Sequence, residues 1–181
     1  NGHDELDVDY AMRYGAPSIG DTLDAMRARG CTRILVVPMY PQYSASTTAT
    51  VVDEVGRSLA QWRNQPEMRF VRNFHDDPGY IDALARTVKN HWKHHGPPDK
   101  LVMSFHGVPA RTLQLGDPYH CESHKTARLL AERLGLHKDD YQLTFQSRFG
   151  KAKWLEPYTE PTLMALAKAG VGRVDVICPG F

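Results

Sequence analysis

The sequence predicts an α/β fold in which parallel sheets are flanked by helices, and it predicts two such units. The first observation is that short apolar runs alternate with longer segments of helical periodicity, which is typical of strands joined by crossover helices. The second is that these runs are too short to span a membrane. The third is the string HHGPP at residues 94–98, the best linker candidate in the chain. We therefore predict one unit in residues 1–95 and a second in residues 96–181.

The first unit is predicted to alternate helices with strands. Ser18 is a helix-start signal, Gly30 is a stop signal, and Pro38 marks the end of the strand in the run RILVVPM. Hydroxyl groups from Ser44 to Thr48 suit the start of a further helix. The predicted elements are a helix at residues 18–29, a strand at 33–39, a helix running to about residue 62, a strand at 68–71 and a helix at 80–95.

The second unit is predicted to repeat this alternation. The apolar residues of KLVMSFH form a short run of the kind that lies inside a parallel sheet, and Gly135 and Gly170 are helix stops. Residues 114–119 are predicted to be a loop, and residues 146–158 a long loop or a broken helix. The remaining predicted elements are helices at residues 122–134 and 160–169 and strands at residues 141–145 and 173–178.

Composition limits the classes of function. The 181 residues carry a net charge of +1, so the strongly basic face that nucleic-acid binding needs is not expected. Cys31, Cys121 and Cys178 are far apart and form no CxxC pair. This pattern favours reduced thiols in a cytoplasmic protein over a disulfide framework or a zinc site.

His106 is the first candidate for chemistry because it stands where a buried strand opens into a loop. In open α/β sheets, ligands bind at this carboxyl edge of the strands. Gly107 allows a turn or a close approach at the next position. A histidine there can ligate a metal or accept a proton near neutral pH. From spacing alone, a simple strand cap is an equally good interpretation.

Several longer strings resemble one known family. In order, the chain contains YAMRYGAPSI, PMYPQYSASTT, SFHGVP, GDPYHCESHKTAR, YQLTFQSRFGKAKWLEPYT and VDVICPGF, and ferrochelatases of the proteobacterial type carry similar strings. The resemblance implies two Rossmann-like, chelatase-type domains with the active cleft between them, which agrees with the pattern of elements. It also implies a lyase that inserts ferrous iron into protoporphyrin IX to form protohaem, the last step of haem biosynthesis.

The resemblance assigns the central role to His106, as the catalytic proton acceptor and metal-facing group. The family's partner glutamate follows the CPGF string and therefore lies beyond Phe181. The chain also begins without methionine and stops just after a predicted strand. We therefore expect a fragment that lacks both ends and, lacking this carboxylate, is itself inactive.

The resemblance further implies that four residues of the first unit line the porphyrin cleft. Arg13 would pair with a propionate and Tyr14 would offer its ring face, whereas the residues alone favour a surface arginine beside a core tyrosine. Tyr40 and Ser44 follow the carboxyl end of a predicted strand. A plain turn with a helix cap explains these two residues as well as a role in binding does.

The resemblance also implies that the loop after the strand at residues 141–145 lines the cleft. Gln146, Ser147 and Trp154 are its candidate substrate-binding residues. For Trp154 the alternative is burial in the core, which is the commoner fate of a tryptophan.

The resemblance also bears on cofactors and partners. Animal ferrochelatases carry an iron–sulfur cluster with a cysteine ligand in the string that reads YPQYSASTT here, and this chain has Ala45 at that position. We expect no cluster and no permanently bound cofactor, with ferrous iron as substrate. Protoporphyrin IX and iron are the expected partners, nucleic acid is not, and peripheral membrane contact and the oligomeric state are left open.

Two pairs of other histidines have i, i+4 spacing, which places both members on one helix face. His91 and His95 lie at a predicted helix end, where imidazolium suits the helix dipole. His120 and His124 flank the string CES. His91 and His95 could hold a surface metal but have no evident third ligand. The string HCESH suggests a metal cluster, but this is disfavoured because i, i+1 neighbours point to different helix faces.

Two other functions are kept as alternatives. One is a chelatase of the same fold that acts on another metal and tetrapyrrole, although relatives of that kind carry more histidines in the cleft. The other is a non-catalytic porphyrin- or haem-binding protein, in which His106 would be an axial ligand. An oxidoreductase is disfavoured because no GxGxxG string follows a strand.

Overall fold

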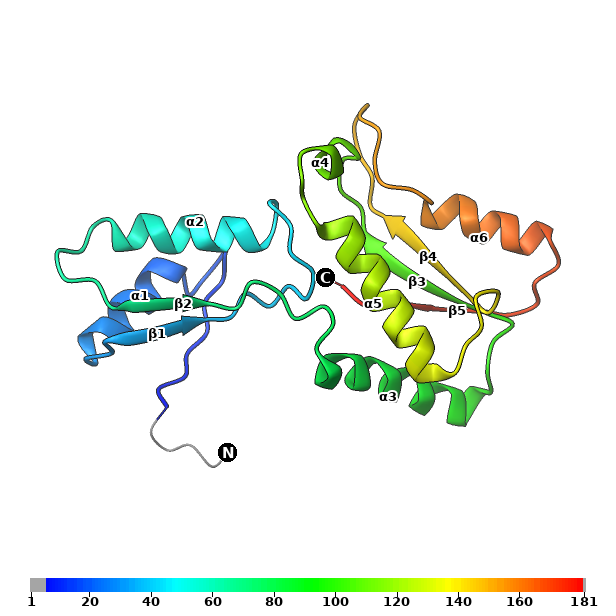
Figure 1. Cartoon of the computed structure of the whole chain (residues 1–181), viewed down its shortest axis with the longest axis horizontal. Coiled ribbons are helices and arrows are strands. Elements are labelled where there is room, and N and C mark those ends of the chain that lie inside the picture. The colour runs from blue at the N-terminus through cyan, green and yellow to red at the C-terminus, as the bar shows by residue number, and fades with distance from the viewer. Residues whose placement is uncertain (1–5, 181) are drawn as a thin grey trace. The chain divides into compact units, whose positions relative to one another are not determined.

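The computed structural model describes residues 6–180, which form two compact units (Figure 1). The first unit holds the chain up to Met39 together with Ser44–Asn73. The second holds the chain from Phe74 onward together with the short segment Tyr40–Tyr43. Four residues of the loop after the first strand thus belong to the other unit, and the contacts that hold them there are described below.

The first unit is a two-stranded parallel sheet with two helices. Its elements are α1 (Ile19–Ala28), β1 (Arg33–Val36), α2 (Thr48–Leu59) and β2 (Glu67–Phe70). The strands pair in register from Arg33 with Glu67 to Val36 with Phe70. Ser18 caps α1 as predicted, because its hydroxyl accepts a hydrogen bond from Asp21 N at 3.1 Å. The buried apolar side chains of this unit are Ile19, Leu23, Ile34, Val51, Val55 and Trp62.

The second unit is a three-stranded parallel sheet in the order β4-β3-β5. The central strand is buried along most of its length, as its apolar sequence predicts. In chain order the elements are α3 (Pro78–His95), β3 (Lys100–His106), α4 (Arg111–Gln114), α5 (Tyr119–Leu134), β4 (Tyr141–Gln146), α6 (Thr159–Lys168) and β5 (Val174–Ile177).

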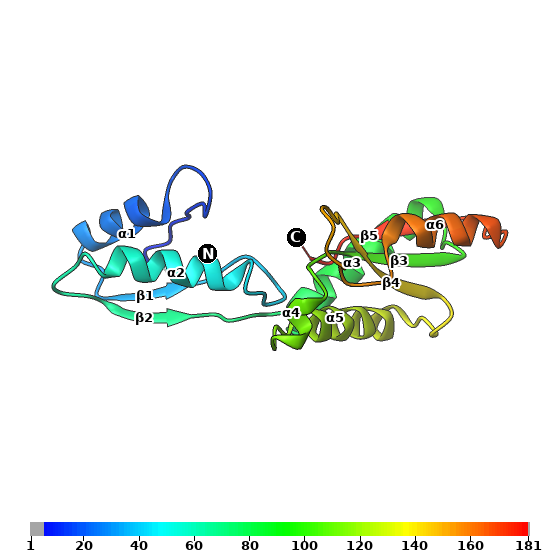
Figure 2. The same ribbon diagram turned by 90° about the horizontal axis from the view of Figure 1, so that it is seen from above.

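The two faces of this sheet differ in chemistry, and Figure 2 shows α5 and α6 on opposite sides of β3 and β4. Phe105 and Phe145 pack with Tyr119 and Leu130 of α5 in the apolar core. Ser104 lies on the α6 side, where its hydroxyl bonds to Thr159. Because successive side chains of a strand alternate between faces, one face of the sheet is apolar and the other carries hydroxyl groups.

The structure confirms the parallel α/β architecture and differs from the prediction in four details. The compact units divide after Asn73, not at residues 95 and 96, because α3 packs along α5 and the HHGPP string only ends that helix. The first strand ends at Val36, before Pro38. The sequence also gives no sign of the single helical turn α4, and Thr47 caps α2 without a side-chain hydrogen bond.

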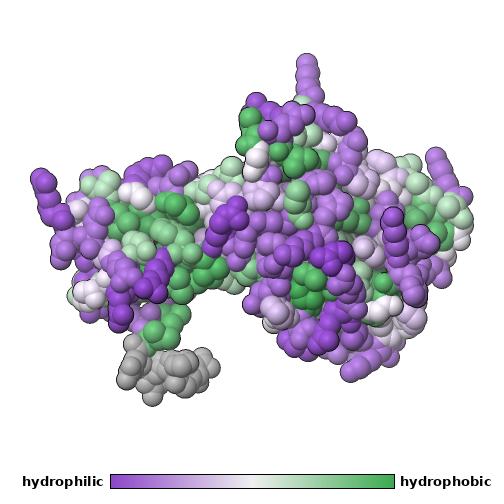
Figure 3. Space-filling view, in the orientation of Figure 1, coloured by the Kyte–Doolittle hydropathy of each residue, from purple (hydrophilic) through white to green (hydrophobic). Residues whose placement is uncertain are grey.

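Polar and apolar groups are interspersed on the face that Figure 3 displays. In the part of the chain that the structure describes, every helix is too short or too polar to cross a bilayer.

Candidate active site

His106 and Gln146 end neighbouring strands of the second unit. They are the last residues of β3 and β4, and they face each other in the parallel register. Both side chains are partly buried. The carboxyl ends of parallel strands form one edge of the sheet, so the structure places this histidine and this amide side by side at the edge where ligands bind.

Gly107 allows the two strand ends to come close. Its N–H donates to the carbonyl oxygen of Gln146 at 2.7 Å. A Cβ at this position would lie 2.7 Å from the same oxygen and 3.2 Å from Cε3 of Trp154. Gly107 is not among the residues with positive φ, so space rather than backbone torsion requires glycine here.

A row of buried hydroxyl groups on the α6 side of the sheet leads to Gln146. The oxygens of Thr144 and Thr159 are 2.9 Å apart, and those of Thr159 and Ser104 are 2.8 Å apart. Ser104 then donates to Oε1 of Gln146 at 3.1 Å. Ser104 and Thr144 are completely buried. Because the Gln146 carbonyl oxygen accepts this hydrogen bond, the orientation of the amide is fixed. Its NH₂ group is then the end that can donate to other partners.

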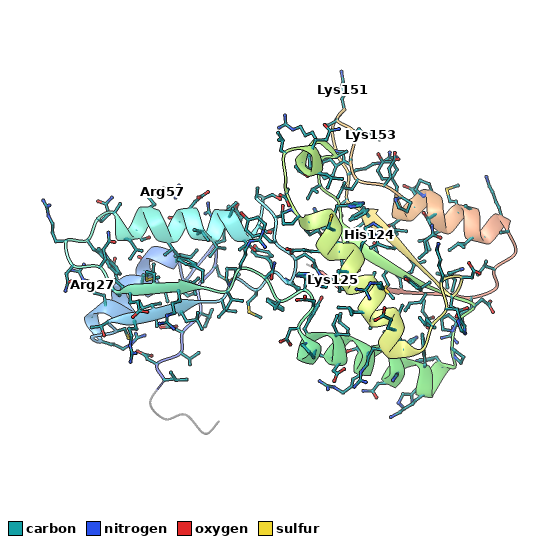
Figure 4. The ribbon with its side chains drawn as sticks, viewed as in Figure 1. Arg27, Arg57, His124, Lys125, Lys151 and Lys153 are labelled. Atoms are coloured by element: carbon teal, nitrogen blue, oxygen red, sulfur yellow. The ribbon has the colours of Figure 1, made fainter. Side chains whose placement is uncertain are left out.

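The loop after β4 forms a wall beside Gly107. Trp154 is buried, which fits the core interpretation, and its Nε1 donates to the carbonyl oxygen of Phe149 at 2.9 Å. Ser147 adopts a left-handed conformation with φ of 66°, so the chain turns sharply directly after the strand. Lys151 and Lys153 project from the tip of this loop (Figure 4). The loop thus presents a rigid indole to the site and cations to solvent.

Arg13 and Tyr14 form a stacked pair in the first unit. The Arg13 guanidinium lies 4.5 Å from the centroid of the Tyr14 ring, which is 77% exposed. Its Nε donates to the carbonyl oxygen of Thr50 at 2.9 Å, and a second nitrogen lies 3.6 Å from Glu54. Tyr14 is therefore a surface tyrosine rather than the core residue that its type alone suggests.

Ser44 also belongs to the first unit, but its hydroxyl has a local role. The side chain is buried, and its oxygen lies 2.9 Å from that of Ser46 and accepts a hydrogen bond from Ser46 N at 3.2 Å. Its carbonyl oxygen accepts from Thr47 N at 3.1 Å. These contacts form a turn that leads into α2, whose N-cap residue is Thr47 rather than Ser44.

Tyr40 lies in the segment Tyr40–Tyr43, which two side chains fasten to the second unit. Gln42 is 2% exposed, and its Nε2 donates to Thr126 Oγ1 at 3.0 Å and to the carbonyl oxygen of Pro179 at 3.2 Å. The buried carboxylate of Glu122 accepts a hydrogen bond from Tyr43 N at 2.7 Å. Sequence reasoning gave Gln42 equally as a functional residue or part of a plain turn, and it assigned no role to Glu122. Nothing in the strings PQYS and HCESH shows that either side chain is buried.

Burial shifts the pKa values of several groups in the second unit. It raises the pKa of Tyr80 to about 12, and the Tyr80 hydroxyl donates to the Pro179 carbonyl oxygen. It lowers the pKa values of His120 and His124 on α5, and in His124 the nearby His120 lowers the pKa further. Neutral imidazole is thus favoured at both of these positions.

The described residues contain no cluster of three or more histidine, cysteine, aspartate or glutamate side chains arranged to hold a metal. An open hollow of about 520 Å³ lies between α3 and α5, and no predicted site residue lines it. Of the predicted site residues, the structure brings together His106, Gln146, Ser147 and Trp154 at one sheet edge of the second unit. Arg13, Tyr14 and Ser44 belong to the first unit.

Comparison with known proteins gives a consistent result. The ferrochelatase family model matches residues 1–181. The ferrochelatase of Azoarcus sp. (strain BH72) is 69% identical over 178 residues, covering 98% of this chain and 49% of that protein. That of Aromatoleum aromaticum is 70% identical over 174 residues, covering 96% and 48%. The chain thus spans about half the length of these curated relatives.

A solved structure is similar in fold. The structure described as SirB from Bacillus subtilis with Fe3+ matches with a TM-score of 0.66 over 91% of this chain and 60% of that chain. Sequence identity is 17%, so this match shows the chelatase-type arrangement of strands and helices and nothing about the site.

Proposed function

Because this chain belongs to the ferrochelatase family, we propose that the complete protein inserts ferrous iron into protoporphyrin IX to form protohaem. The observation that carries the proposal is the position of His106, which ends the central strand β3 at the ligand-binding edge of a parallel sheet. The two units are then parts of two Rossmann-like domains.

Metal insertion requires that the two pyrrole N–H protons leave the ring and that iron is transferred to its nitrogens. In this proposal, His106 accepts a proton or faces the incoming iron, because an imidazole can act as a general base and as a ligand for ferrous iron. The Gln146 amide lies beside it, oriented by Ser104.

The remaining candidates hold the flat macrocycle. Trp154 supplies a wall that cannot shift easily, because it is buried against Gly107. The exposed Tyr14 ring offers a stacking face. Arg13 has five N–H donors, of which Thr50 and Glu54 engage only part, so it can pair with a propionate. Tyr40 and Ser147 are proposed as further porphyrin contacts.

Ser44 contributes to substrate binding, in this proposal, by shaping the start of α2 rather than by direct contact. The proposal includes no iron–sulfur cluster, on the basis of Ala45 and of three cysteines without cluster spacing. It also includes a cytoplasmic location, on the basis of the cysteine pattern.

The test is porphyrin metallation by the complete protein. We would follow the loss of protoporphyrin fluorescence after adding ferrous iron without oxygen, or zinc as a substitute. His106→Ala is expected to slow insertion by about 100-fold or more, since general-base contributions are of that size. His94→Ala is the matched control, because His94 is an exposed histidine on α3. Full activity of His106→Ala would refute the proposed role, and porphyrin binding without insertion by wild type would indicate a carrier protein.

A further inference from the structure

His120 and His124 form a pair of imidazoles on the first two turns of α5. Their ring centroids are 4.4 Å apart and their planes are inclined by 47°. The i, i+4 spacing places both rings on one face of the helix. Figure 4 marks His124 on this helix. Two imidazoles at this spacing are the arrangement with which helices present a pair of nitrogen ligands to one metal ion.

The surroundings favour the form of the imidazole that binds metals. The Phe145 ring lies 6.0 Å from His120 in a stacked arrangement and 6.4 Å from His124. Burial against this apolar surface lowers both histidine pKa values, so both rings are mostly neutral at pH 7. His124 is nevertheless exposed and His120 only partly buried, so an ion in solution can reach the pair.

The positive charges nearest along the helix already have partners. Lys125 Nζ lies 2.6 Å from Asp76, and Arg128 lies 2.6 Å from Glu132. These ion pairs reduce the repulsion that a cation bound beside His124 would meet.

The pair lies on the opposite side of the sheet from the side chain expected to do the chemistry. His120 and His124 contact Phe145, which packs on the α5 face together with Phe105. His106 follows Phe105 in β3, so its side chain projects from the opposite, α6 face of the sheet. An ion held by the α5 pair would therefore occupy a different place from an ion at His106.

We propose that His120 and His124 form a binding site for a divalent first-row transition-metal ion, with water completing its coordination. Imidazole nitrogens bind ferrous, nickel, copper and zinc ions, whereas magnesium and calcium prefer oxygen. No third protein ligand converges on the pair among the described residues. A site with two protein ligands and several waters exchanges its metal, unlike a closed four-ligand structural site.

The second histidine pair of the chain provides a matched comparison. The ring centroids of His91 and His95 on α3 are 4.5 Å apart, almost the same as in the α5 pair. However, His91 Nε2 is 3.6 Å from Asp175, and that carboxylate already accepts hydrogen bonds from Arg173 and Trp92. The Arg173 guanidinium also donates to the His95 carbonyl oxygen. A metal ion at this pair would meet the guanidinium charge, so the site should bind more weakly.

The experiment is a calorimetric titration of the complete protein with zinc ions alone, without porphyrin. The double variant His120→Ala/His124→Ala should lose the tightest class of zinc binding, and His124→Ala should weaken it by at least about tenfold. His91→Ala/His95→Ala should leave that class unchanged. Circular dichroism would check folding, and His124→Ala keeps the test valid if the double variant misfolds, because His124 is exposed.

Zinc binding that keeps its wild-type affinity in His124→Ala, or that disappears in His91→Ala/His95→Ala, would overturn the inference. The outcome does not depend on the proposed function. Loss of metallation in His106→Ala and loss of zinc binding in the α5 variants are separate readouts, and either can fail alone.

Discussion

Replacing Gly107 with alanine tests the packing of the candidate site. The new Cβ would lie 2.7 Å from the Gln146 carbonyl oxygen, a backbone atom that already accepts the Gly107 N–H. It would also lie 3.2 Å from Trp154, whose indole is fixed by its hydrogen bond to Phe149. The methyl group can fit only if the ends of β3 and β4 separate.

The size of the effect follows from two contributions. Overpacking a well-filled site costs about 1 to 3 kcal/mol. Weakening the Gly107–Gln146 hydrogen bond costs about 1 kcal/mol more. We therefore expect the free energy of unfolding to fall by about 2 to 4 kcal/mol, which is a large part of the roughly 5 to 15 kcal/mol that holds a domain together.

Urea unfolding of the complete protein, followed by circular dichroism, measures this change. For a urea dependence of about 2 kcal/mol per molar, the midpoint should fall by about 1 to 2 M. Gly56→Ala is the matched control, since Gly56 lies within α2 and a Cβ there meets nothing within 4 Å. That change should stabilise by about 0.5 to 1 kcal/mol. If the two variants shift the midpoint in the same direction, the close-approach argument for Gly107 is wrong.

Three further predictions concern the same unit and the metal content. Ser104→Ala should lower the free energy of unfolding by about 1 to 3 kcal/mol, because Thr159 and Gln146 lose a buried partner. As a control, replacing the exposed Thr87 with alanine should change the free energy of unfolding by no more than about 0.5 kcal/mol in the same urea assay. Burial raises the pKa of Tyr80 to about 12, above the value of about 10 in the unfolded chain, so the folded state holds this proton more tightly. Its stabilising contribution should be present below pH 10 and decline as the pH rises to 12, and Tyr80→Phe should remove this part of the pH dependence in thermal unfolding. The purified complete protein should show no visible absorption from an iron–sulfur cluster, and a cluster spectrum would contradict the assignment made from Ala45.

The parts of the structure that could be predicted from sequence are those with local causes. Ser18 caps α1 through a backbone group three residues away, and Gly135 ends α5 in the left-handed conformation. The run that forms β3 is apolar because both of its faces are covered, so its position and its end at His106 follow from the residues themselves. The placement of His106 beside Gln146 needs only that both strands are parallel and end at the same edge.

The parts that could not be predicted depend on contacts between distant segments. The HHGPP string is a true helix end, but whether α3 belongs with the preceding or the following chain is decided by its packing on α5. Gln42 looks like an ordinary polar loop residue, and its burial depends on Thr126 and Pro179. For Trp154, the sequence left burial and pocket lining as alternatives, and the structure shows a buried indole whose ring edge also borders Gly107.

The segment Tyr40–Tyr43 also sets an order in which the chain can fold during synthesis. Its partners are made much later than the segment itself, since Gln42 is 84 residues from Thr126 and 137 residues from Pro179. The chain of the first unit, up to Asn73, is thus complete while the place for Gln42 does not yet exist. Closing such long loops is slow compared with forming helices and neighbouring strands. Insertion of this segment should therefore be among the last steps of folding, after β5 has left the ribosome, and until then the polar groups that bind Gln42 must stay accessible to water.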